Sequence, residues 1–263
     1  MDLQLQGKRA LVTGASRGLG YAIAQTLAQE GANIALNSRT AESLSAAAQG
    51  LAQQTGVRVE ALPGDVTDPA VPAQLITRTA ELLGGLDMLV TNTGGPPSGK
   101  FETFDDDAWH AAIDLSLMSH VRLIRAALPA LRESQAASVL TLTSYSVKQP
   151  IPNLVLSNSV RAATVGLTKT LALELGADGI RFNSILPAWT ETERVGELMG
   201  YRAEANGTTV EHETAKQAAE SPFGRMASPQ EFANAAVFLL SPAASYISGV
   251  MLTVDGGMYK GTL

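Results

Sequence analysis

Three glycines spaced G-x3-G-x-G follow the first apolar run of the chain, in the segment TGASRGLG (residues 13–20). In a turn between a strand and a helix, Gly14 would allow a tight bend, Gly18 would let the backbone approach a pyrophosphate, and Gly20 would let the helix pack on the sheet. The N-terminus of such a helix offers free N–H groups and a partial positive charge to a phosphate. The segment therefore predicts a nucleotide-binding turn, and the alternative is an ordinary glycine-rich turn.

The end of the second apolar run distinguishes between the two nicotinamide cofactors. An Asp or Glu there would bind a ribose 2′-hydroxyl and select NAD, but the residues are Asn37, Ser38 and Arg39. Arg39 offers a planar guanidinium to a 2′-phosphate, and Arg17 in the glycine-rich turn could share that charge. The sequence favours NADP(H) over NAD(H), unless both arginines are merely solvated.

A further segment, LSNSVRAA (residues 156–163), carries two serine hydroxyls and a guanidinium. None of these groups exchanges a proton readily at neutral pH, because the serine hydroxyl is a very weak acid and the pKa of arginine is about 12.5 or more. Ser157 and Arg161 can hold a ligand by hydrogen bonds and charge. Whether a site built around them does chemistry or only binds is left open by the residue types.

Short apolar runs alternate with longer helical patterns along the chain. Strands are predicted at 9–14, 33–38, 57–62, 86–92, 137–144, 180–186 and 249–257, and helices at 18–30, 41–54, 69–83, 105–132 and 154–175. Strands of continuous Val, Ile and Leu, each followed by a helix, are typical of a parallel sheet covered on both faces. We therefore expect one α/β domain over residues 1–263, Rossmann-type, with a doubly wound, seven-stranded, mostly parallel sheet.

The polar and charged stretch at about 190–222 interrupts this alternation. Long insertions of this kind often cover a ligand, so we expect a lid-like element. The alternative is a solvated pair of helices.

Composition excludes several classes of function. The chain of 263 residues has no cysteine, a net charge of −6 and no run of Lys and Arg, which excludes thiolate metal sites and disfavours nucleic-acid binding. The three histidines, His110, His120 and His212, form no close ligand pair, so no metal site is expected. No signal peptide and no apolar stretch of roughly 18 residues is evident. We expect a cytoplasmic protein that binds no membrane.

These features, in this order, resemble the short-chain dehydrogenase/reductase family over nearly the whole chain. The segment GDVTD (64–68) looks like the family's adenine-contacting loop, VTNTGG (90–95) is similar to its Asn-Asn-Ala-Gly segment, and LPAWTET (186–192) stands where the family contacts the nicotinamide. Together with the turn and the end of the second strand, the resemblance implies a set of cofactor-binding residues. They are Gly14, Ser16, Arg17, Gly18, Leu19, Gly20, Ser38, Arg39, Asp65, Val66, Asn92, Gly94, Arg161, Pro187 and Thr192.

The catalytic positions implied by the resemblance are mostly substituted. The family usually has Asn on the helix after the fourth strand, Ser at the end of the fifth, and a Tyr-x3-Lys pair thirteen residues later. Here these positions hold Ser116, Ser144, Ser157 and Arg161. The chain resembles a divergent subgroup often labelled 3-oxoacyl-carrier-protein reductase-like.

The resemblance implies an NADP(H)-dependent oxidoreductase that reduces a carbonyl, such as a 3-oxoacyl thioester, or oxidises an alcohol, with a non-standard proton donor. Lys148, four residues past Ser144, and Tyr145 are candidates for that donor, although Tyr145 would point to the opposite face if the strand continued. His110 and His120 are expected to be packed or at the surface, and His212 or Tyr201 would enter only with the lid. The other class of function is a nucleotide-binding pseudoenzyme with a sensing or assembly role. Many family members are tetramers that pair through long helices, so a homotetramer or homodimer is expected.

Overall fold

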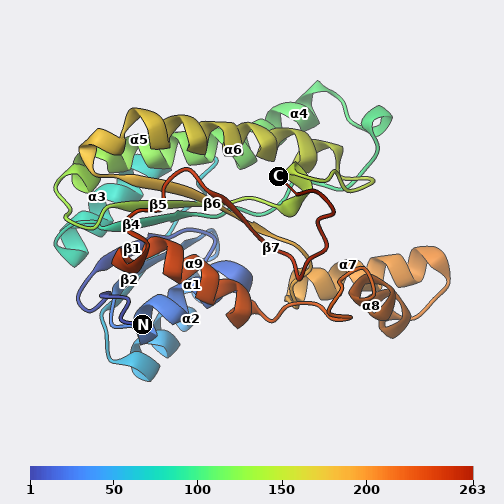
Figure 1. Cartoon of the computed structure of the whole chain (residues 1–263), viewed down its shortest axis with the longest axis horizontal. Helices are drawn as coiled ribbons and strands as arrows, with labels where there is room; N and C mark the ends of the chain where they lie inside the picture. Colours follow the sequence, from blue (N-terminus) through green and yellow to red (C-terminus); the bar gives the residue numbers. More distant parts are fainter. Residues whose placement is uncertain (263) are drawn as a thin grey trace.

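A seven-stranded sheet forms the middle layer of the computed structural model, which describes residues 1–262 (Figure 1). Its strands are β1 (Arg9–Val12), β2 (Asn33–Ser38), β3 (Val59–Pro63), β4 (Met88–Thr91), β5 (Ser138–Leu142), β6 (Arg181–Pro187) and β7 (Met251–Val254). They lie in the order β3-β2-β1-β4-β5-β6-β7, and every neighbouring pair is parallel. The predicted doubly wound fold is confirmed. The sheet was predicted to be mostly parallel, and all of its described strands are parallel. Residue 263 of the predicted domain lies outside the described residues.

The central strands are apolar on both faces because both faces are covered. In β1, successive residues point to opposite sides: Leu11 belongs to one hydrophobic core, and Ala10 and Val12 belong to the other. All three side chains are fully buried. Continuous apolar runs, rather than alternating ones, are therefore what this sheet requires.

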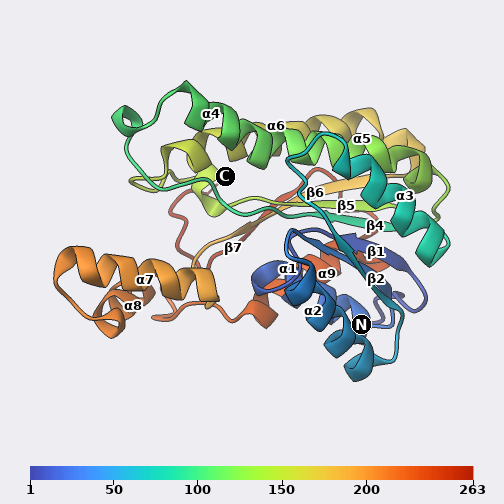
Figure 2. The ribbon, with the colours of Figure 1, turned by 180° about the vertical axis from the view of Figure 1, so that it is seen from behind.

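Helices cover the sheet on both sides, as Figures 1 and 2 show. On one face lie α1 (Gly18–Gln29), α2 (Ala41–Thr55) and α9 (Pro229–Leu240), and on the other lie α3 (Val71–Leu83), α5 (Ser119–Arg132) and α6 (Val155–Glu174). Short 3-10 turns complete the described elements: η1 (Phe101–Thr103), η3 (Tyr145–Val147), η4 (Gly176–Asp178) and η5 (Pro242–Ala244). No helix in the part of the chain that the structure describes is long and apolar enough to cross a membrane.

The helix predicted over 105–132 is interrupted, which corrects the expectation of one regular helix. It consists of α4 (Asp106–Ile113), a π-helical turn η2 (Asp114–Met118) and α5. Asp105 caps its start by accepting a hydrogen bond from the backbone N–H of Ala108, at 3.0 Å. The π-helical turn shifts the hydrogen-bond register by one residue and leaves a carbonyl free for another partner. That turn holds Ser116.

The insertion at about 190–222 folds into two helices, α7 (Glu193–Asn206) and α8 (Val210–Ala218). They pack against each other and project beyond the carboxyl ends of the strands, on the right of Figure 1. Thr192 and Thr209 cap their starts through their side-chain oxygens. Gly207 ends α7 in the left-handed conformation.

Candidate active site

The candidate site lies at the carboxyl edge of the sheet, where the chain order reverses. β1 pairs with β2 on one side and with β4 on the other, so the connections after β1 and β4 leave in opposite directions. In open parallel sheets, ligands bind in the crevice at such a switch point. The glycine-rich turn follows β1, and the segment VTNTGG spans the end of β4 and the residues after it. The two segments that the sequence assigned to the cofactor are therefore neighbours.

Hydrogen bonds connect these two segments directly. The Nδ2 of Asn92 donates to the carbonyl of Gly14 at 3.1 Å, and the Thr13 hydroxyl donates to the carbonyl of Asn92 at 2.8 Å. Gly14 has φ of +58°, and a β-carbon there would lie 2.8 Å from the Asn92 amide nitrogen. Only glycine fits this bend. Asn92 thus fixes the shape of the turn from the β4 side.

Close packing also explains why residue 20 of this turn is a glycine. A β-carbon at Gly20 would lie 2.3 Å from the carbonyl oxygen of Gly14. At Gly18, in contrast, the nearest atom to such a carbon is the methyl group of Thr192, 4.0 Å away. The space over Gly18, at the start of α1, is therefore open in the way that a bound pyrophosphate requires. Ser16 and Leu19 flank this opening and are half-buried.

The end of β2 fits a 2′-phosphate. The Ser38 hydroxyl is buried and has no hydrogen-bond partner among the described residues, and Arg39 beside it is exposed without an ion pair. Asn37 is buried and donates from Nδ2 to the carbonyls of Leu62 and Gly64, which holds the following loop against β2. An unsatisfied buried hydroxyl next to an unpaired guanidinium suits a phosphate group.

The loop after β3, where the resemblance implied an adenine contact, is held together by its own hydrogen bonds. Asp65 accepts two hydrogen bonds from Thr67, one from its backbone N–H at 3.0 Å and one from its hydroxyl at 2.8 Å. Val66 is buried against the core that includes α3 and α5. The carboxylate is engaged within its own loop, so Val66 and the loop backbone form the surface that an adenine would meet.

The start of α7 reaches over the glycine-rich turn. Arg17 forms an exposed ion pair with Glu193, with Nη1 and Oε2 2.8 Å apart. Thr192, which the sequence assigned to the nicotinamide, caps α7 five residues after Pro187, the last residue of β6. The insertion therefore begins directly over the predicted phosphate position. The charge of Arg17 is already paired with the carboxylate of Glu193.

Arg161 is the residue that joins the candidate catalytic groups. It is 6% exposed, and its Nη1 donates to the carbonyls of Leu142 and Thr143, at 3.2 and 3.1 Å, while its Nη2 donates to the carbonyl of Gly94 at 3.2 Å. Burial, together with the nearby charge of Arg194, lowers the pKa of Arg161 to about 10, so the side chain stays cationic at neutral pH. It fastens α6 to the end of β5 and to the segment after β4.

Two hydroxyls lie on either side of this contact. Ser144 directly follows Thr143, and its Oγ accepts a hydrogen bond from the backbone N–H of Ser146 at 3.2 Å. Ser157 lies one helical turn before Arg161, on the same side of α6, and is half-buried. Its hydroxyl makes no hydrogen bond with any described residue. The structure thus places Arg161 against the residue before Ser144, with Ser157 one helical turn away on the same side of α6.

Ser116 and His120 form a buried polar layer behind that end. The Ser116 carbonyl accepts a hydrogen bond from the Thr164 hydroxyl at 2.5 Å, which satisfies a carbonyl in the π-helical turn. Nδ1 of His120 lies 2.7 Å from the Thr91 hydroxyl, while its Nε2 and the Ser116 Oγ are buried without partners among the described residues. Burial first, and then the charge of Arg161, lower the pKa of His120 to about 3. His120 was expected to be packed or at the surface, and its closeness to Arg161 had no signal in the sequence.

The other candidate donors are occupied elsewhere. The ammonium of Lys148 lies over the ring of Tyr259, 5.3 Å from its centre, and no contact among the described residues links it to Arg161. Tyr145 stands in η3, not on a continued strand, and is buried in a cluster with Leu186 and Met258. Burial, reinforced by two nearby carboxylates, raises the pKa of its phenol. Tyr201, His110 and His212 are exposed.

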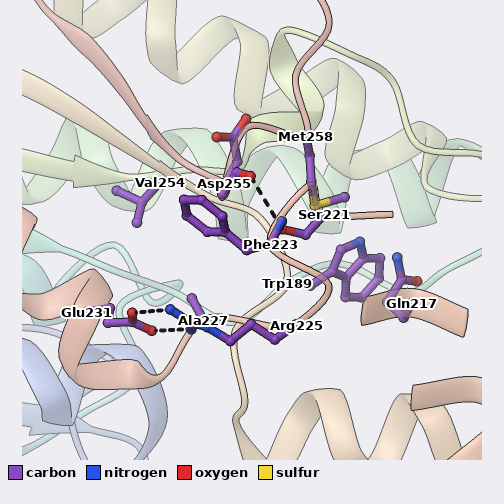
Figure 3. Close-up of a pocket in the computed structure, with 11 residues that line it drawn as sticks. Trp189, Gln217, Ser221, Phe223, Arg225, Ala227, Glu231, Val254, Asp255 and Met258 are labelled. Carbon is purple, nitrogen blue, oxygen red and sulfur yellow. Dashed lines mark hydrogen bonds and ion pairs between the residues drawn. The ribbon is translucent and has the colours of Figure 1, made fainter. Parts of the chain in front are cut away.

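A hollow of about 110 Å³ lies next to this cluster, between α8, the end of β7 and the start of α9 (Figure 3). Arg225 and Glu231 close its lower side with an ion pair, and the indole of Trp189 and the amide of Gln217 lie side by side at its right. Its lining contains none of the predicted catalytic or cofactor residues. Within the described residues, no group of three or more His, Cys, Asp or Glu side chains could hold a metal ion.

Comparisons with known proteins define the class. A family model described as enoyl-(acyl carrier protein) reductase matches residues 14–259. The 3-oxoacyl-[acyl-carrier-protein] reductase FabG of Escherichia coli (strain K12) is 33% identical over 257 residues, which cover 98% of this chain and 99% of that protein. The chain belongs to the short-chain dehydrogenase/reductase family of oxidoreductases, as the resemblance implied.

Two solved structures are also similar over nearly their whole length. L-sorbose reductase from Gluconobacter frateurii, complexed with NADPH and L-sorbose, has a TM-score of 0.96 and 35% identity over 99% of this chain and 100% of its own. A short chain oxidoreductase from Pseudomonas aeruginosa PAO1, NADPH-bound and containing an atypical catalytic center, has a TM-score of 0.90 and 30% identity. The match covers 98% of this chain and 99% of that chain. Both relatives hold NADPH, in agreement with the cofactor predicted from Arg39.

Proposed function

We propose that this protein is an NADPH-dependent reductase of small carbonyl compounds that works without the family's tyrosine acid. The observation that supports the proposal is the contact of the cationic Arg161 with the backbone next to Ser144, together with the position of Ser157 one helical turn before Arg161. The chain would then belong to a divergent, 3-oxoacyl-carrier-protein reductase-like subgroup. The Pseudomonas aeruginosa relative, described as having an atypical catalytic center, supports the existence of such members.

NADPH would be held along the carboxyl edge of the sheet. Arg39 and the unpaired Ser38 hydroxyl would bind the 2′-phosphate, and the start of α1 would bind the pyrophosphate. Pro187 and Thr192 would lie at the nicotinamide end. When bound, NADPH supplies the hydride.

The chain's own residues would stabilise the oxygen of the reacting carbonyl. As negative charge develops there, Ser144 and Ser157 would donate hydrogen bonds, and the fixed charge of Arg161 would stabilise it electrostatically. Ser157 would pass a proton to this oxygen and regain one from solvent, since its hydroxyl has no competing partner. A weak acid in this role costs rate, because general acid catalysis typically contributes about 10²–10⁴-fold.

The relatives suggest which carbonyl compounds to test first. One is named for 3-oxoacyl carrier-protein reduction and another was solved with L-sorbose, so thioesters and keto sugars are the starting probes. We further propose that α7 and α8 act as a lid and that the protein is a homodimer or homotetramer. The predicted cytoplasmic location stays a proposal as well.

The second candidate function is a nucleotide-binding pseudoenzyme with a sensing or assembly role. It is favoured by one observation: three of the five guanidinium N–H groups of Arg161 are engaged by backbone carbonyls, which is what a structural residue would do. In that case the site would bind NADPH without transferring its hydride to a substrate.

Turnover separates the two candidates. The purified protein is mixed with NADPH and, in turn, with 3-oxoacyl thioesters, keto sugars, quinones and small aldehydes, and the loss of NADPH absorbance is followed. We expect slow, substrate-dependent oxidation that falls about a hundredfold in Ser144→Ala while NADPH binding is unchanged. Saturable NADPH binding without oxidation by any compound would favour the pseudoenzyme.

A further inference from the structure

Arg194, in the first turn of α7, is an exposed cation without a partner. It makes no ion pair or hydrogen bond with any described residue, although Glu193 next to it pairs with Arg17. Sequence analysis assigned it no role. An unpaired arginine at a surface is ordinary, so a functional role depends on where the Arg194 guanidinium points.

That direction is toward Gly95 and the guanidinium of Arg161. The Nη2 of Arg194 lies 3.1 Å from the point where a β-carbon on Gly95 would sit, and the Nη2 of Arg161 lies 3.9 Å from the same point. Gly95 follows Gly94, whose carbonyl Arg161 binds. Two guanidinium groups from different elements, α6 and α7, therefore converge beside one glycine.

Neither cation is neutralised by a carboxylate. The hydrogen bonds of Arg161 all go to backbone carbonyls, and no ion pair of the described chain includes Arg161 or Arg194. The two charges repel, which is one reason why the pKa of Arg161 is lowered. Two adjacent cations without a counter-charge are unfavourable unless an anion joins them.

The cofactor's diphosphate is one anion that could join them, but the geometry favours the substrate. Glu193 and Arg194 are neighbours on α7 and reach different sides of the cleft. Glu193 reaches Arg17 in the glycine-rich turn, where a diphosphate would lie. Arg194 instead lies beside Gly95 and Arg161, and Arg161 also binds the carbonyl of Thr143, the residue before Ser144.

We propose that Arg194 binds a carboxylate carried by the substrate close to its reacting carbonyl, in the field of Arg161. The substrate class is then a small oxo acid rather than a neutral ketone. The assignment of a substrate rests on the proposed reductase function, but the binding of an anion at Arg194 can be measured without turnover. Arg194 would act as a specificity-determining residue, placed so that the lid helix itself contacts the bound molecule.

A matched pair of unreactive probes tests the charge requirement. Oxamate and oxamide have the same size and differ by one carboxylate, and each is titrated into the protein saturated with NADPH while cofactor fluorescence is followed. We expect oxamate to bind about tenfold more tightly than oxamide. Arg194→Gln should abolish that preference, Arg194→Lys should keep part of it, and the surface control Arg78→Gln should keep all of it.

Several results would overturn the proposal. Equal binding of the two probes, no saturable binding of oxamate, or an unchanged preference in Arg194→Gln would each do so. A loss of NADPH affinity of about tenfold in Arg194→Gln, with the probe preference intact, would instead assign Arg194 to the cofactor diphosphate. Failure of the reductase function would appear separately, as oxamate binding without NADPH oxidation by any carbonyl compound.

Discussion

In the function that we propose, Ser157 and Arg161 take the place of an acid and its cationic neighbour, as a weak acid and a permanent cation. The guanidinium of Arg161 satisfies three carbonyls at once, which a planar group with several N–H donors does well. With its pKa lowered only to about 10, it keeps its charge at neutral pH and cannot relay a proton. Under this proposal Arg161 supplies electrostatic stabilisation, and the proton has to come through a hydroxyl.

Arg39 should determine the choice of cofactor. It is exposed, makes no ion pair with any described residue and lies beside the Ser38 hydroxyl, which has no hydrogen-bond partner among those residues either. We expect Arg39→Ala to weaken NADPH binding by about tenfold or more and to leave NADH binding nearly unchanged, because only NADPH carries the 2′-phosphate. Fluorescence titration of both cofactors measures this, with exposed Arg78→Ala as the control. Equal losses for the two cofactors would contradict the assignment.

His120 should make the folded protein less stable in mild acid. The pKa of its buried ring is lowered to about 3, whereas an unfolded histidine titrates near 6.5. Between these values the unfolded state binds the extra proton, so stability is present above pH ~6.5 and is lost as the pH falls. We expect the unfolding free energy to be about 2 kcal/mol smaller at pH ~5 than at pH ~7.

Urea denaturation at the two pH values measures the loss. His120→Asn should remove most of the pH dependence, whatever it does to stability itself, since Asn can still meet the Thr91 hydroxyl. The exposed His212→Asn should leave the pH dependence unchanged. The same dependence in all three proteins would show that His120 is not its source.

Among the elements, α6 uses the side chain of Arg161 to contact both the end of β5 and the segment after β4. Arg161→Met would keep much of the volume but leave the carbonyls of Leu142, Thr143 and Gly94 without this donor. Each lost bond costs about 1 kcal/mol, partly offset because no charge has to be buried, so we expect a net loss of about 2 kcal/mol in urea denaturation. Arg17→Met, at an exposed ion pair, should cost well under 1 kcal/mol. Equal effects would show that Arg161 does not hold these elements together.

Which elements could be predicted depended on how local their causes are. The seven strands followed from apolar runs bounded by polar turns, and α1 followed from the glycines that open it. The π-helical turn at 114–118 could not be predicted, because apolar residues continue at helical spacing through it, and its freed carbonyl is satisfied by Thr164, which is distant in sequence. A strand predicted to Ser144 would have turned Tyr145 to the opposite face, but β5 ends at Leu142 and a 3-10 turn follows.

The molecule as a whole places the predicted cofactor segments that follow strands at one edge of the sheet, and this placement could be predicted from the strand pattern. Each segment follows a strand, and parallel strands bring their carboxyl ends together. The catalytic end was less predictable. The hydrogen bonds of Arg161 go to backbone carbonyls of other elements, and Arg194 approaches Gly95 from a helix that is distant in sequence, so no residue type records these positions.

The outer face of α6 should join two copies of the chain. It exposes Ala162, Ala163, Gly166 and Leu173, small or apolar residues that allow close helix packing. A β-carbon on Gly166 would meet nothing within 4 Å in the single chain. Gly166→Glu should therefore leave the fold intact but lower the mass measured by light scattering to that of a monomer. Gly50→Glu, equally unobstructed on α2, should keep the oligomer, and a wild-type monomer would refute the predicted assembly.

The central claim is that this protein transfers a hydride even though Ser157 replaces the family's acid. Its most direct test uses NADPH carrying deuterium at the transferable C4 position, incubated at length with the protein and a carbonyl substrate, followed by mass spectrometry of the product. We expect deuterium on the carbinol carbon of the alcohol. The rate at which this labelled alcohol forms should fall about a hundredfold in Ser144→Ala. Unlabelled or absent alcohol, with NADPH shown to be bound, would contradict the claim and leave a protein that only binds the nucleotide.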